Sequence, residues 1–296
     1  MNKRTKYLRE RSLEVPASIS HERAELITDF YNSGRADGKS IPEQRALAFL
    51  YIMENKSIFI DANELIVGER GEKPKATPTY PEICLHSKED LETLDSREKQ
   101  NFAVSNETYN IFKKEIIPFW QGKTMRERIF EEMTEAWKNA YYAGVFTEFQ
   151  EQRAPGHTVL GKDMFSKGFL NLQEEIKGHI SQLNFQDDPN ALDKLEELRA
   201  MHITSGAIIR FAERHAKALK DLANLEQDIR RKKELFEMER ICRKVPANPP
   251  NTFHEALQHY WFIHQGVITE LNPWDSFNPG RLDQNIYPFY TIFFND

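Results

Sequence analysis

The sequence contains little cysteine and no long apolar run. Its two cysteines, Cys84 and Cys242, lie far apart and outside any Cys-x-x-Cys pattern. This excludes a disulfide scaffold and a zinc-finger framework, and it favours a reducing compartment. No stretch approaches the roughly eighteen apolar residues of a membrane span, and no apolar core of a secretory signal follows the basic first residues. The sequence therefore predicts a cytoplasmic globular protein with no membrane segment.

The chain also lacks an excess of positive charge. Its 40 Lys and Arg residues are outnumbered by 46 Asp and Glu, which gives a net charge of -6. The basic run 230–233 lies between acidic neighbours, which favours a solvated helix face over a nucleic-acid patch. With 40% hydrophobic and 29% charged residues, the composition suits a packed core, in about two domains or one large one.

Signature motifs of several enzyme classes are absent or broken. Neither GxGxxG nor GxSxG occurs, which removes the usual dinucleotide-binding and hydrolase signatures. Residues 156–163 nearly match a phosphate-binding loop, but Asp163 puts an anion where a magnesium-binding hydroxyl is needed. His254 and His259 lie five residues apart, about 140° around a helix, so they cannot share one metal ion. We therefore expect no metal site in this chain.

Helical patterns dominate the first two thirds of the sequence. Ser40 and Thr124 each begin a capping-box pattern followed by apolar residues at helical spacing. A further helix is predicted to end or kink at Pro118. Residues 190–243 carry one apolar stripe that loses its phase near Asn224, which predicts a helical hairpin.

Strand patterns are scarce. Residues 57–60 and 64–67 could form a short hairpin, and 267–271 is the best strand candidate. The proline-rich stretch 245–250 separates this last part of the chain from the helical body.

Two segments look unlike ordinary helix or linker. Residues 146–158 mix aromatic, acidic and basic side chains with Pro-Gly, and such a loop can present His157 as an acid, a base or a hydrogen-bond donor. The alternative for this segment is a connector with a solvated histidine.

The second unusual segment, 270–284, follows the predicted strand. Asp275 would stand at the carboxyl end of that strand beside Trp274 and Phe277, where ligands bind in α/β proteins. Aromatic walls disfavour the charged form of a carboxyl group, as an acid catalyst at neutral pH requires. The alternative is a plain structural turn.

Four separated motifs carry a family resemblance. They are Glu64-Leu-Ile-Val-Gly-Glu69, Thr79-Tyr-Pro-Glu-Ile83, Arg153-Ala-Pro-Gly-His-Thr158 and Gly280-Arg-Leu-Asp-Gln284. In this order they resemble the N-terminal part of glycyl radical enzymes, the pyruvate formate-lyase superfamily. Residues 270–284 look most like the trans-4-hydroxy-L-proline dehydratases of that superfamily.

The resemblance implies a fold and a domain organisation. The fold class is a predominantly α segment that forms the N-terminal portion of a ten-stranded α/β barrel. Residues 1–245 would form a mostly helical outer layer, and 251–290 a helix and the first barrel strand with the active-site turn. Residues 291–296 form an atypical tail that does not continue the family pattern.

The resemblance also implies roles for single residues. His157 and Asp275 fall on polar active-site positions, His157 in contact with the departing hydroxyl and Asp275 as a proton acceptor or donor. Phe149 falls on a position that lines the substrate pocket. Trp274 and Phe277, the aromatic neighbours of Asp275 in the sequence, are predicted as further substrate contacts.

The radical chemistry of the family depends on motifs that are not found in these 296 residues. Members carry a stable radical on a glycine in Arg-Val-x-Gly-Tyr and form a thiyl radical on a cysteine in Gly-Cys-x-Glu, and neither motif occurs here. Cys84 and Cys242 are therefore interpreted as structural. We expect no directly bound cofactor, because an iron–sulfur, S-adenosylmethionine-dependent activating enzyme would install the glycyl radical under anaerobic conditions.

These observations predict a truncated dehydratase that is inactive alone. Its expected partners are a small-molecule substrate, the activating enzyme, and a complementing C-terminal fragment or a second copy of the chain, with no nucleic acid and no membrane. A barrel cut after its first strand exposes apolar surface, so the chain would aggregate, oligomerise or need that fragment. The alternatives are a catalytically dead helical scaffold that binds a partner, and another family member such as a C–C lyase or a diol dehydratase.

Overall fold

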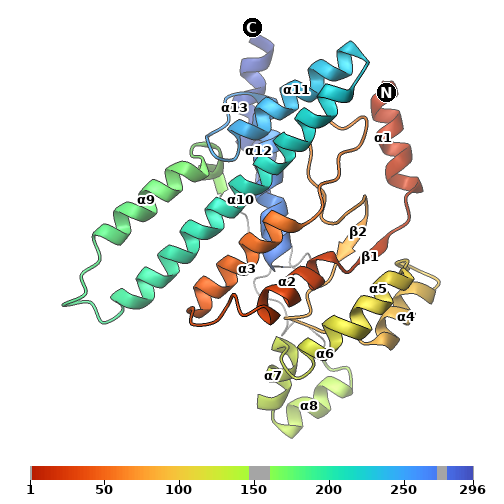
Figure 1. The fold of residues 1–296 in the computed structure, drawn as a ribbon, viewed down its shortest axis with the longest axis vertical. Coiled ribbons are helices and arrows are strands. Elements are labelled where there is room, and N and C mark those ends of the chain that lie inside the picture. The colour runs from red at the N-terminus through yellow and green to blue at the C-terminus, as the bar shows by residue number, and fades with distance from the viewer. Residues whose placement is uncertain (1, 147–160, 272–278, 296) are drawn as a thin grey trace.

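The computed structural model describes residues 2–146, 161–271 and 279–295, and these are mainly helical (Figure 1). The helices are α1 (Lys3–Glu14), α2 (Glu22–Asn32), α3 (Ile41–Asn55), α4 (Lys88–Ser96), α5 (Asn106–Ile111), α6 (Ile117–Trp120), α7 (Met125–Glu132), α8 (Glu135–Tyr142), α9 (Phe169–Ser181), α10 (Ala191–Leu225), α11 (Ile229–Lys244), α12 (Phe253–Leu271) and α13 (Leu282–Asn295). Two short strands, β1 (Ser18–Ser20) and β2 (Ala76–Pro78), pair in parallel. The predicted predominance of helix is confirmed.

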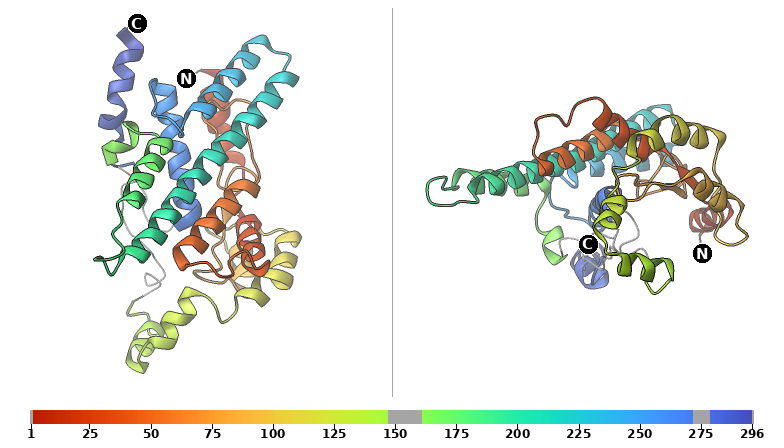
Figure 2. Two further views of the ribbon diagram at one scale, coloured as in Figure 1. Left: turned by 60° about the vertical axis from the view of Figure 1, so that its left-hand side comes forward. Right: turned by 90° about the horizontal axis from the view of Figure 1, so that it is seen from below.

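The predicted helical hairpin is formed by α10 and α11. It turns just after Leu225, and the Asp228 side chain begins α11 by accepting a hydrogen bond from the backbone N–H of Arg231 at 2.7 Å. α3, α10, α11 and α12 pack side by side (Figures 1 and 2). The largest core cluster lies between them, and its fully buried members include Met53, Phe211 and Phe262.

The helix-capping predictions have different outcomes. Thr124 and Glu127 form the predicted reciprocal capping box at the start of α7. Ser40 is the residue before α3, but its hydroxyl makes no capping hydrogen bond.

Upstream of Pro118, a π-helical segment, Phe112–Ile116, joins α5 to α6. The proline lacks a backbone N–H and crowds the carbonyl four residues earlier, so regular α-helical bonding cannot run through this point.

The two strand candidates read from the sequence pattern, 57–67 and 267–271, are wrong, while the barrel strand implied by the resemblance is not found at 267–271 and residues 272–278 lie outside the described residues. Residues 267–271 form the last turn of α12. Their β-branched residues Val267, Ile268 and Thr269 favour a strand locally, but Ile268 and Thr269 are buried as part of the helix. The 57–67 segment contains no strand. Instead, the side-chain amide of Gln258 pairs with the backbone of Val67, accepting from its N–H and donating to its carbonyl, each at 2.8 Å.

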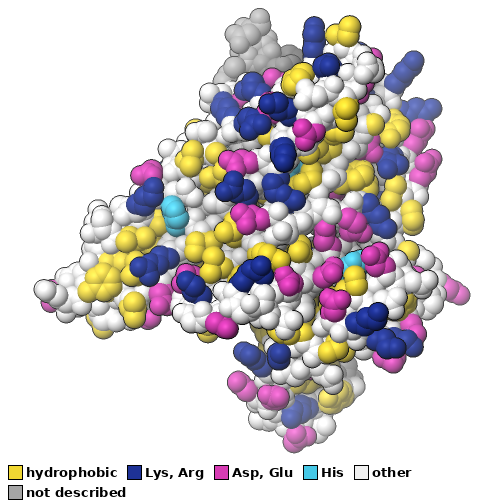
Figure 3. Space-filling model, in the orientation of Figure 1, with side chains coloured by type: hydrophobic (Ala, Val, Ile, Leu, Met, Phe, Trp, Pro, Cys, Tyr) yellow, Lys and Arg dark blue, Asp and Glu magenta, His cyan; other side chains and the backbone are white. Residues whose placement is uncertain are grey.

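Charges of both signs are interspersed over the face of the molecule that Figure 3 shows. In the basic run of α11, both Arg230 and Arg231 lie within 4 Å of Glu234. Arg230 is exposed, as predicted for a solvated helix face, whereas Arg231 is largely buried and donates to the carbonyl of Glu64. No described helix is long and apolar enough to cross a membrane.

Gly168, immediately before α9, and Gly178, within it, give a paired test of the packing around this helix. A Cβ on Gly168 would overlap the carbonyl oxygen of Ala247, because the next two backbone N–H groups donate to the carbonyls of Pro246 and Ala247. Gly168→Ala is expected to lower the free energy of unfolding by about 1–3 kcal/mol. Gly178→Ala, which meets nothing within 4 Å, is expected to raise it by about 0.5–1 kcal/mol. Urea unfolding of both variants checks this, and equal effects would contradict the close contact.

Candidate active site

All five predicted site residues lie outside the described residues. These are Phe149, His157, Trp274, Asp275 and Phe277. The structure does describe the elements that flank them. The short 3-10 helix Gly161–Phe165 follows the first segment, and α12 leads directly into the second.

The 3-10 helix is attached to α12. His259 of α12 is buried, and its Nε2 lies 2.7 Å from the carbonyl oxygen of Met164. Because a carbonyl only accepts, Nε2 carries the proton. Burial lowers the pKa of His259 to about 4, so the ring stays neutral at pH 7. Met164 and Phe165 complete the contact by packing on Ala256 and Ile263 of α12. One helix thus links the end of the first predicted segment to the start of the second.

The carboxyl end of α12 is held by side chains from two other parts of the chain. The last carbonyls of a helix have no partner within the helix. Here the Arg23 Nε donates to the carbonyl of Thr269 at 2.6 Å, and the Tyr80 hydroxyl donates to the carbonyl of Ile268. We call Arg23, Tyr80 and Glu82 the α12 clamp. The α12 clamp holds the last turn of α12, which ends at Leu271, immediately before residues 272–278.

The α12 clamp is built around a buried arginine. The Arg23 guanidinium meets both carboxylate oxygens of Glu82, at 2.6 and 3.2 Å, and lies 4.0 Å from the centre of the Tyr80 ring. Burial lowers the pKa of Arg23, but attraction to Glu82 and the hydrogen bond to it outweigh burial and raise the pKa overall. Burial also raises the pKa of Tyr80, so its hydroxyl keeps the proton that it donates.

A loop that precedes β2 is tied to the first turn and to the middle of α12. The Trp261 Nε1 donates to the carbonyl of Gly68 at 2.8 Å, and the His254 Nε2 lies 2.6 Å from the carbonyl of Leu65. Gly68 has φ +129°, and a Cβ there would lie 3.2 Å from the Trp261 ring. Glycine is therefore needed for both the backbone conformation and the close approach. His254 and His259 each bind a different carbonyl, and no metal-binding group of His, Cys, Asp or Glu occurs within the described ranges.

A cavity of about 1350 Å³ adjoins the carboxyl end of α12. Leu271 and Glu270 line it together with Trp120, Arg45 and other side chains. An ion pair of 2.6 Å between Arg45 and Glu270 joins α3 to the last turn of α12. The described structure therefore provides an open space directly beside the point where the second predicted segment begins.

Comparison with known proteins decides the family. The pyruvate formate lyase-like family matches residues 1–292. The chain belongs to this family. It is 47% identical over 287 residues to the trans-4-hydroxy-L-proline dehydratase of Clostridioides difficile, a match that covers 97% of this chain and 36% of that enzyme. It is 31% identical over 286 residues to an isethionate sulfite-lyase of Nitratidesulfovibrio vulgaris, with 92% and 34% covered.

Solved structures of family members share the fold. The C. difficile dehydratase, crystallised with trans-4-hydroxy-L-proline, superposes with a TM-score of 0.95 at 46% identity, covering 100% of this chain and 37% of that one. The B12-independent glycerol dehydratase of Clostridium butyricum superposes with a TM-score of 0.91 at 31% identity, covering 98% and 37%. The chain thus spans little more than a third of the length of these relatives. Its helical fold is that of the N-terminal portion of their barrel, as predicted.

Two of the four family motifs contact α12. Residues 64–69 and 79–83 stood out in the sequence only as a resemblance, yet both bind α12. The clamp residue Arg23 lies in neither motif and was missed, because nothing local distinguishes one arginine on an amphipathic helix from a solvated one.

The two cysteines are free thiols; Cys242 is buried in α11, and Cys84 follows the α12 clamp residue Glu82 by two positions. Burial raises the pKa of both Cys84 and Cys242. Since the thiolate is the reactive form, both thiols are suppressed as nucleophiles, which fits their interpretation as structural residues.

Proposed function

We propose that this chain forms the N-terminal part of a glycyl radical dehydratase that removes water from trans-4-hydroxy-L-proline. The observation that carries the proposal is the difference between two sequence identities, each measured over nearly the same number of aligned residues. The chain is 47% identical to the hydroxyproline dehydratase and 31% identical to the isethionate lyase. The match covers 36% of the dehydratase, so the activity of the whole enzyme is part of the proposal.

In this proposal the chain supplies one wall of the substrate pocket. Asp275 exchanges a proton with the substrate, and His157 contacts the departing 4-hydroxyl group. Phe149, Trp274 and Phe277 line the pocket. The α12 clamp supports the proposal, because it anchors the backbone immediately before the segment that contains Asp275.

The radical machinery is proposed to lie outside these 296 residues, on the same or another polypeptide. A cysteine in Gly-Cys-x-Glu would remove a hydrogen atom next to the substrate nitrogen, and the 4-hydroxyl would then leave as water. An iron–sulfur, S-adenosylmethionine-dependent enzyme would install the glycyl radical. This chain alone is then inactive.

A chimaera tests the substrate. Residues 1–290 replace the corresponding segment of the C. difficile dehydratase, and the activated protein is assayed for water loss from trans-4-hydroxy-L-proline, glycerol and propane-1,2-diol, and for sulfite release from isethionate. We expect turnover of hydroxyproline alone. A folded, radical-bearing chimaera that prefers another substrate would replace the hydroxyproline assignment with another branch of the family.

A catalytically dead scaffold that binds a partner is the alternative, and the two radical motifs decide between it and the enzyme. Neither Gly-Cys-x-Glu nor Arg-Val-x-Gly-Tyr occurs in these 296 residues. The DNA downstream of codon 296 separates the two candidates. A continuation that encodes both motifs, in frame or after a frameshift, supports the enzyme, and their absence from that region supports the scaffold.

A further inference from the structure

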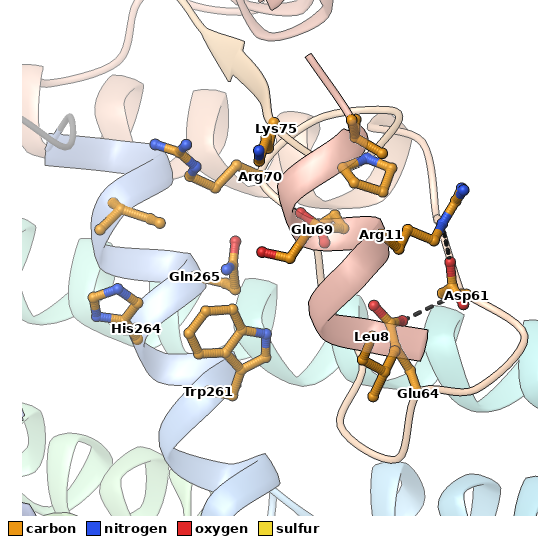
Figure 4. A pocket seen from close by; sticks show the side chains of 14 residues that line it. Leu8, Arg11, Asp61, Glu64, Glu69, Arg70, Lys75, Trp261, His264 and Gln265 are labelled. Atoms are coloured by element: carbon orange, nitrogen blue, oxygen red, sulfur yellow. Dashed lines mark hydrogen bonds and ion pairs between the residues drawn. The ribbon is translucent and has the colours of Figure 1, made fainter. Parts of the chain in front are cut away.

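A second cavity, of about 560 Å³, lies between α1 and α12 (Figure 4). Trp261, Gln265 and Ile268 of α12 line one side of it. α1 lines another side and has no buried residue of its own. Ion pairs anchor this helix at both ends, from Arg4 to Glu234 at 2.5 Å and from Arg11 to Asp61 at 2.6 Å. The space beneath α1 is therefore held open by charged contacts at its edges.

The charged side chains that line this cavity are separated by sign. In the view of Figure 4, Arg70 and Lys75 lie at one end and Glu64 at the other, with Glu69 between them beside Gln265. Arg11 and Asp61 neutralise each other through their ion pair. Within the described part of the chain, neither Arg70 nor Lys75 forms an ion pair. The cavity is thus dipolar, with cations at one end and carboxylates at the other.

One buried polar atom on this cavity has no partner. Gln265 is 1% exposed, its side chain projects into the cavity in Figure 4, and its Oε1 accepts no hydrogen bond from any described residue. A buried acceptor without a donor costs about 1–3 kcal/mol. The oxygen is therefore suited to a donor that a ligand would bring.

An aromatic wall faces the same space. The Trp261 ring is fixed by its hydrogen bond to the carbonyl of Gly68 and stacks on His264, with ring centres 5.5 Å apart. Aromatic faces attract ammonium groups. Burial raises the pKa of Glu64 to about 7 and also raises the pKa of Glu69, so both carboxylates would be stabilised by a cation placed beside them.

We propose that this cavity binds a small zwitterion of the amino-acid class. Its ammonium group donates hydrogen bonds to the Gln265 Oε1 and the Glu69 carboxylate, against the Trp261 ring. Its carboxylate pairs with Arg70 and Lys75. The lining carries cations and carboxylates, and a zwitterion, which is neutral overall, likewise carries one charge of each sign. This binding is independent of the proposed dehydratase reaction, because it needs only the described residues.

Three probes of similar length test the proposal on the 296-residue chain by calorimetry and by NMR. They are 4-aminobutanoate, butylammonium and butanoate. We expect 4-aminobutanoate to bind at least tenfold more tightly than either singly charged probe. Absence of saturable 4-aminobutanoate binding up to about 10 mM, or equal binding of all three, would overturn the proposal.

Variants locate the binding. Gln265→Leu removes the acceptor and Lys75→Met removes one cation while keeping most of the side-chain volume, and each is expected to weaken 4-aminobutanoate binding about tenfold. Lys177→Met, on the exposed face of α9, is the control and should bind like the original chain. If Gln265→Leu does not fold, Lys75→Met decides the question alone. Unchanged affinity in a folded Lys75→Met variant contradicts the assignment.

Discussion

Arg23→Ala is expected to lower the free energy of unfolding by about 3–5 kcal/mol, because it breaks a buried ion pair. Glu82 would lose a counter-ion that contacts both of its carboxylate oxygens. The carbonyl of Thr269 would lose its donor at the end of α12, where no helical partner exists. The Tyr80 ring would lose the guanidinium that lies over it.

Urea unfolding measures this effect, with three further variants for comparison. Lys177→Ala removes an exposed pair with Glu174 and should change stability by less than about 0.5 kcal/mol. Arg23→Lys keeps the charge but cannot match the two-point contact with Glu82, so it should fall between the original and alanine. In an Arg23 and Glu82 double-mutant cycle, we expect strong coupling between the two side chains. If Arg23→Ala lowered the free energy of unfolding as little as Lys177→Ala does, the α12 clamp would not stabilise the fold.

Asp275→Asn in the chimaera is expected to slow water loss from hydroxyproline by at least about 100-fold, because an amide of the same shape cannot exchange the proton. The radical content of the activated protein, measured by electron paramagnetic resonance, should stay the same, since the change does not touch the radical glycine. His157→Gln should also slow the reaction, through a weaker contact with the leaving hydroxyl group.

Asp221→Asn is the matched control for this experiment. Asp221 lies exposed on α10, so the same chemical change there should leave the rate unaltered. If Asp275→Asn turned over hydroxyproline at the rate of this control, the proton-exchange role of Asp275 would be wrong, while the family and the fold would still stand.

Local signals were enough to predict much of the helical structure. The capping box at Thr124 and the loss of phase near Asn224 both depend on neighbouring residues, and both predictions hold in the structure. Residues 267–271 show where local signals fail. Val267, Ile268 and Thr269 are β-branched, which suits a strand, but these residues continue the helix that begins at Phe253 and packs against neighbouring helices.

The sequence by itself determined the family, the predominance of helix and the hairpin of α10 and α11. Each of these depends on motifs, apolar spacing or caps that involve only residues close together in the sequence. Only the tertiary structure decided that α12 supports two of the four family motifs, 64–69 and 79–83. Arg23 meets Glu82 across 59 positions and Thr269 across 246. No periodicity spans such separations, so the α12 clamp and the dipolar cavity exist only once distant side chains are buried together.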